Sequence, residues 1–91
     1  MLRIITEQRG NVFHLALHGT VADEGIAVLD EHWRGIREKA PSAVVNVDLA
    51  NVMFIDAHGE RLLQRMARCG VEFHAAGLLN QYVLEKIAGG L

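Results

Sequence analysis

The start of the chain alternates apolar and polar residues with the two-residue period of β-strands. One such run extends from Leu2 to Glu7, and a second extends from Val12 to His18, where three large apolar residues share one face. Arg9-Gly10-Asn11 separates the two runs, and glycine and asparagine both tolerate the positive φ angles of a tight turn. The pattern therefore predicts a β-hairpin.

Two helices are predicted from apolar residues at three- and four-residue spacing. The first extends from Ala22 to Lys39, and acidic residues near its start and basic residues near its end complement the helix dipole. The second extends from Gly59 to Cys69. It has one apolar face, and its other face carries three arginines at positions Arg61, Arg65 and Arg68.

Two further strands and a closing helix complete the predicted order. The strands extend from Ala43 to Leu49 and from Val71 to Ala75, and the helix from Leu79 to Ala88. The first of these strands is apolar on both faces apart from Asn46 and Asp48, as expected for a central strand covered by helices. The order β-β-α-β-α-β-α predicts an α/β fold, a single domain over residues 1–91, with a mixed four-stranded sheet and about three helices.

The segment from Asp48 to Gly59 joins the third predicted strand to the second predicted helix. We expect the apolar run from Val52 to Ile55 to turn the chain back through the core. Asp56 follows, just before the helix, where a carboxylate can accept backbone N–H bonds, and Asp48 is expected to be a structural hydrogen-bonding group. Because ligands of open α/β sheets bind beyond the carboxyl ends of the strands, any specific function is expected at the residues from Asp56 to Gly59.

The element order and this segment together resemble a STAS domain (sulfate transporter and anti-sigma factor antagonist). In that family a strand ends in Asp-Leu, and a short apolar stretch then leads to Asp-Ser-Ser-Gly at the start of the second helix. Here Val47-Asp48-Leu49 matches the first part, and Phe54-Ile55-Asp56-Ala57-His58-Gly59 matches the second. The resemblance covers the chain from Leu2 to Gly90 and implies a STAS-type αβ sandwich.

This chain departs from the family at Ala57, which stands where anti-sigma antagonists carry the phosphorylated serine. The resemblance therefore implies a non-enzymatic protein-interaction module that works without phosphorylation, with regulation from the partner, a ligand or protonation of His58. The implied partner is an anti-sigma factor or another kinase-like ATPase, or an ABC-transporter ATPase if the chain is an accessory subunit. The implied contact residues are Asp56, Ala57, His58, Gly59, Arg61, Leu62 and Arg65.

Composition narrows the remaining function classes. The net charge of -2 argues against a general nucleic-acid binder. No apolar run approaches the roughly 20 residues that span a bilayer, so membrane insertion is not expected. Cys69 is the only cysteine, which excludes an internal disulfide and favours a reducing, cytoplasmic location. An exposed strand edge would allow a homodimer.

Other kinds of site have weaker support in the sequence. A small-molecule or nucleotide sensor could use the N–H groups at the Asp56–Gly59 helix start, although no glycine-rich phosphate loop is present. The five histidines lack metal-ligand spacing, so neither a metal nor a cofactor is expected. Cys69 is expected to be a buried small residue, and no catalytic centre is predicted. The arginine face is either solvated or a patch for an acidic partner.

Overall fold

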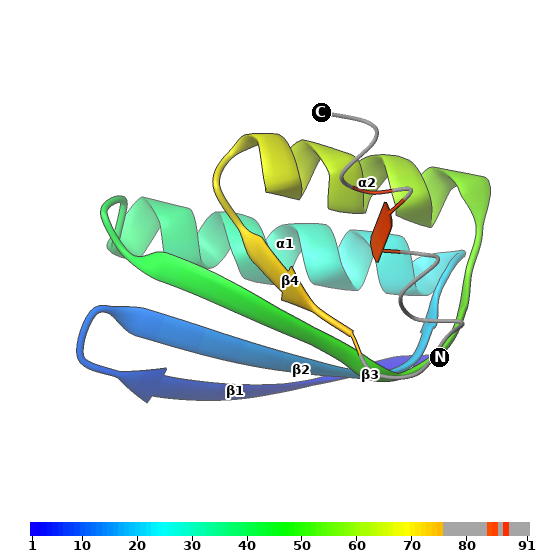
Figure 1. Ribbon diagram of the computed structural model, residues 1–91, viewed down its shortest axis with the longest axis horizontal. Coiled ribbons are helices and arrows are strands. Elements are labelled where there is room, and N and C mark those ends of the chain that lie inside the picture. The colour runs from blue at the N-terminus through cyan, green and yellow to red at the C-terminus, as the bar shows by residue number, and fades with distance from the viewer. Residues whose placement is uncertain (76–83, 86, 88–91) are drawn as a thin grey trace.

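In the part of the chain that the structure describes, a four-stranded sheet carries two helices on one of its faces (Figure 1). The computed structural model describes residues 1–75, 84, 85 and 87. Within them the elements are β1 (Leu2–Arg9), β2 (Val12–Val21), α1 (Glu24–Lys39), β3 (Val44–Ile55), α2 (Ala57–Arg68) and β4 (Glu72–His74). The predicted mixed sheet of a small α/β fold is confirmed, whereas most of the third helix predicted from Leu79 to Ala88 falls outside the described residues. None of the described helices is long and apolar enough to cross a bilayer.

The strands lie in the order β1-β2-β3-β4. β1 and β2 form the predicted antiparallel hairpin, whose turn holds Gly10 at a φ of 58°. β2 pairs with β3 in parallel, and β3 pairs with β4 in parallel. Each parallel connection passes through one helix, and because such crossovers share one hand, both helices lie on the same side of the sheet and run in the same direction (Figure 1).

β3 is longer than the sequence predicts. Val52–Ile55 does not turn through the core; it continues β3, because pairing with β2 as far as Val21 satisfies its backbone groups. The register shifts twice along this pairing, and such bulges change which side chains face the core. Val52 and Ile55 pack against the core, whereas Met53 and Phe54 are 80% and 58% exposed.

The core fills the space between the sheet and the two helices. Its fully buried side chains come from both layers, and the largest are Leu15, Leu17, Leu29, Leu49, Leu62, Leu63 and Met66. β3 is less buried than the sequence predicts for a central strand covered by helices, because Val44 is 43% exposed and Asp48 is exposed. The opposite face carries polar side chains, as is common where only one face of a sheet is packed.

Gly59 allows α2 to start directly on the end of β2. A Cβ atom at this position would overlap the carbonyl oxygen of Val21 and also press on the Val21 side chain. The same carbonyl accepts a hydrogen bond from the Asp56 N–H at 3.3 Å. The backbone of β2 therefore fixes where α2 begins, and no side chain fits between them.

Replacing Gly59 by alanine should lower the free energy of unfolding by about 3 kcal/mol, because the new methyl group must displace backbone. Gly35 in α1 is the matched control, since nothing lies within 4 Å of a Cβ atom built there. Gly35→Ala should raise stability by about 0.5–1 kcal/mol through helix propensity alone. Urea unfolding measures both, and a Gly59→Ala variant as stable as the wild type would contradict the close approach.

Candidate functional site

Asp56 caps the start of α2, as the sequence predicts. Its backbone is extended, with φ of -83° and ψ of 178°, and its Oδ1 accepts the N–H of Gly59 at 2.7 Å. Asp48 also has a structural role, because its Oδ1 accepts the N–H of Ala50 at 2.9 Å, beside the first register shift of β3. Asp56 therefore fixes the start of α2, and Asp48 fixes the backbone within β3 near that shift.

Four exposed residues flank Asp56 on its two sides. Met53 and Phe54 precede it, and Ala57 and His58 form the first positions of α2. We call these four residues the β3–α2 corner. Two large apolar side chains are thus exposed to solvent close to the start of α2. The Asp56 cap and the close contact of Gly59 with the Val21 backbone hold that helix start in place.

His58 is held by Arg61, which lies one turn further along α2. Nη1 of Arg61 donates to Nδ1 of His58 at 3.0 Å. Since a guanidinium can only donate, Nδ1 must be the unprotonated nitrogen of the ring, and a proton on Nδ1 would end this contact. His58, Arg61 and Arg65 also line one shallow hollow of about 600 Å³, so the structure brings these three predicted contact residues together.

Two other predicted contact residues do not reach the surface. Leu62 has no exposed area and belongs to the core between the helices and the sheet, so its prediction as a contact residue is wrong. Its position on the apolar stripe of α2 is the physical reason. Gly59 is buried against Val21 and acts by allowing the close approach of α2.

Met53 and Phe54 were not among the predicted contact residues, because a continuous apolar run indicates burial. The two-residue period of side chains along a strand could have indicated that part of this run is exposed. Successive side chains of a strand point to opposite faces, so one buried face cannot take all four side chains from Val52 to Ile55. The bulged pairing with β2 decides which two of these four side chains are exposed.

The remaining candidate chemistry is limited at this corner. The Asp56 carboxylate already accepts the Gly59 N–H and places a negative charge at the helix start, which opposes the binding of an anion there. In the described part of the chain, no three His, Cys, Asp or Glu residues are grouped to hold a metal ion. Cys69 is exposed and not buried as predicted, because it follows the last residue of α2 as its C-cap, beyond the apolar face.

Comparison with known proteins gives a fold relationship. No family model and no curated protein matches the chain. Among solved structures, a crystal structure of a protein named Mglu matches with a TM-score of 0.61 and 24% identity, over 81% of this chain. A native form of Mglu in 4.3 M NaCl matches with a TM-score of 0.43 and 19% identity over 84% of this chain and 26% of its own. The first match shows a shared fold, and this chain spans 19% of that longer protein.

Removing the cap of α2 should cost measurable stability. Asp56→Ala should lower the free energy of unfolding by about 1 kcal/mol, because the Gly59 N–H loses its acceptor. Asp56→Asn is the matched control, since an amide oxygen caps about as well as a carboxylate oxygen and only the charge is lost. Urea unfolding compares the two variants, and an equal loss in both would show that the charge matters and the cap does not.

Proposed function

We propose that the chain is a non-enzymatic protein-interaction module of the STAS type and that the β3–α2 corner is its contact surface. The observation that carries the proposal is the exposure of Met53 and Phe54 immediately before the cap of α2. Large apolar side chains that are grouped in solvent and bordered by polar groups are typical of protein-interaction sites. In this proposal the polar border would be His58 and Arg61, which are hydrogen-bonded to each other in the first turns of α2.

The corner is also suited to binding because its backbone is held in place before a partner arrives. The Asp56 cap and the close contact of Gly59 with Val21 fix the start of α2 on the sheet. A preorganised surface loses little conformational entropy on association, so more of the contact energy contributes to affinity. Phe54 would be the apolar centre of the contact, with His58 and Arg61 at its edge.

The class of partner follows from the resemblance to STAS domains. It would be a regulatory protein such as an anti-sigma factor or another kinase-like ATPase, or an ABC-transporter ATPase for which this chain is an accessory subunit. Ala57 has no hydroxyl group, so binding would be independent of phosphorylation at that position.

A nucleotide or small-molecule sensor is the alternative function at the same place. It would depend on free N–H groups at the start of α2 to hold an anionic group. The Gly59 N–H is already bonded to the Asp56 carboxylate, whose charge would repel such a group. The arrangement at the corner therefore favours the protein-interaction module.

A charge introduced at the corner should abolish partner capture without unfolding the protein. Ala57→Glu adds a carboxylate at an exposed position in the first turn of α2, where the helix dipole tolerates it. Ala27→Glu is the matched control, because Ala27 is also exposed near the start of a helix but lies on α1. In pull-downs from the source organism's lysate, the partner retained by the wild type and Ala27→Glu should be lost with Ala57→Glu. Retention by all three would place the interface elsewhere.

The apolar centre of the corner can be tested with the same partner. Phe54→Ser should weaken its binding by about tenfold or more, because burial of an aromatic side chain is worth roughly 1.5–3 kcal/mol. Val28→Ser is the control, since Val28 is 47% exposed on α1. Binding isotherms with the purified partner measure both. An affinity that Phe54→Ser leaves unchanged would remove the exposed aromatic residue from the contact.

A further inference from the structure

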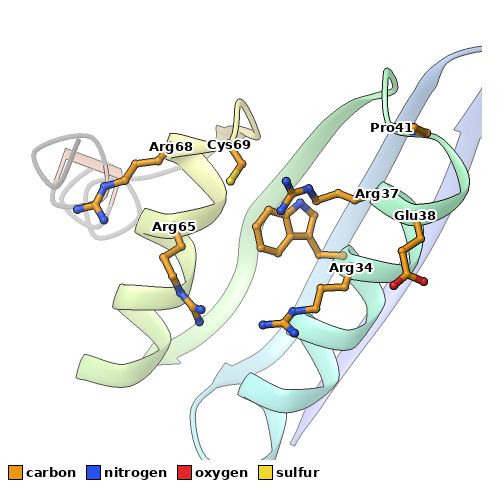
Figure 2. Close-up of a pocket in the computed structure, with 8 residues that line it drawn as sticks. Arg34, Arg37, Glu38, Pro41, Arg65, Arg68 and Cys69 are labelled. Carbon is orange, nitrogen blue, oxygen red and sulfur yellow. The ribbon is translucent and has the colours of Figure 1, made fainter.

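A basic groove lies between α1 and α2, toward the C-terminal ends of both helices (Figure 2). Its volume is about 650 Å³, and its described lining residues are Trp33, Arg34, Arg37, Glu38, Pro41, Arg65, Arg68 and Cys69. Of the nine lysines and arginines of the chain, four are among the described lining residues, although the chain as a whole carries a net charge of -2. Positive charge is therefore concentrated on one face of an acidic protein.

The arginines of the two helices converge on the groove. Figure 2 shows the guanidinium groups of Arg34 and Arg65 turned toward each other from opposite walls. Arg37 lies over the ring of Trp33, with its Cζ atom 4.9 Å from the ring centroid. Glu38 is the one acidic residue of the described lining, and it lies one turn after Arg34 on α1 (Figure 2).

Among Arg34, Arg37 and Arg65, only Arg34 forms an ion pair within the described residues. Arg34 donates to Asp30 at 3.1 Å within α1, but its side chain stays 63% exposed, and exposed pairs of this kind exchange partners at little cost. Within the described residues neither Arg37 nor Arg65 forms an ion pair. Like charges that face each other across a groove repel, and an oxyanion between them would convert that repulsion into attraction.

Helix dipoles explain only part of this arrangement. Arg37, Lys39, Arg65 and Arg68 lie in the last turns of their helices, where positive charge is favourable. The helix dipole favours positive charge at the C-terminal end of each helix. It does not favour a placement in which arginines of two helices face the same groove. Arg34 also lies before the last turn of α1 and still lines the groove.

We propose that this groove binds an extended acidic segment of a partner protein. Successive side chains of an extended peptide point to opposite sides, so neighbouring acidic residues would reach the α1 wall and the α2 wall in turn. The planar guanidinium of arginine pairs with a carboxylate through two parallel hydrogen bonds. The proposal goes beyond the interaction at the β3–α2 corner, since none of the four corner residues lines this groove.

The natural probe of the groove is Trp33, the only tryptophan of the chain. The full chain is titrated with a synthetic peptide of about ten residues, rich in glutamate and free of aromatic residues, while Trp33 emission is followed. We expect a saturable change in emission that weakens as salt is raised, because the charges involved are partly exposed. The same peptide with glutamine in place of glutamate should cause no saturable change.

The double variant Arg34→Gln/Arg65→Gln should raise the dissociation constant of the glutamate peptide by about fivefold or more. It removes one arginine from each wall and leaves Arg37 and Trp33, the reporting pair, unchanged. Lys39→Gln is the matched control, because it removes a charge from the last turn of α1 outside the described lining. Its effect should stay under about twofold at physiological salt, where charges are screened within roughly 8 Å.

Three results would overturn the proposal. One is the absence of saturable binding by the glutamate peptide. Another is equal weakening by Lys39→Gln and by the double variant, which would indicate a general electrostatic attraction to the protein surface. The third is tighter binding of inorganic tripolyphosphate than of the glutamate peptide, which would identify the groove as a site for small phosphate anions. Urea unfolding of each variant confirms that the substitutions at these exposed side chains leave the fold intact.

Discussion

The parallel pairing of β2 with β3 is the interaction on which the rest of the structure depends. At one end of the pairing Val12 lies opposite Val44, and at the other end Val21 lies opposite Ile55. The register between the two strands shifts twice along the way. Its far end supplies the Val21 carbonyl, which accepts the Asp56 N–H and lies against Gly59. The end of the β2–β3 pairing thus determines where α2 starts. The Asp56 cap then stabilises the first turn of the helix.

The same pairing explains the two surfaces of the molecule. Its bulges leave Met53 and Phe54 in solvent while Val52 and Ile55 stay against the core. Parallel strands need crossover connections, and these place α1 and α2 side by side on one face in the same direction (Figure 1). The C-terminal halves of the helices therefore lie together, and the basic residues that suit helix ends meet across one groove.

The two surfaces differ in chemistry and in place. The β3–α2 corner lies at the carboxyl end of β3, and its exposed side chains are mainly apolar. The groove lies toward the opposite end of the helices and is dominated by arginine. Arg65 lines both the groove and the hollow beside His58, so the positive charge continues from one surface toward the other.

Local signals in the sequence determined the kind and order of the described elements, the Asp56 cap, the apolar faces of both helices and the exposure of the arginines on α2. Each of these depends on periodicity or on a cap within a few residues. Only the tertiary structure decided how far β3 continues, that the described helices share one face of the sheet, and that Arg34 of α1 faces Arg65 of α2. It also decided that Phe54 is exposed. These features depend on pairing between segments about thirty residues apart, where a bulge of one residue changes which side chains reach the core.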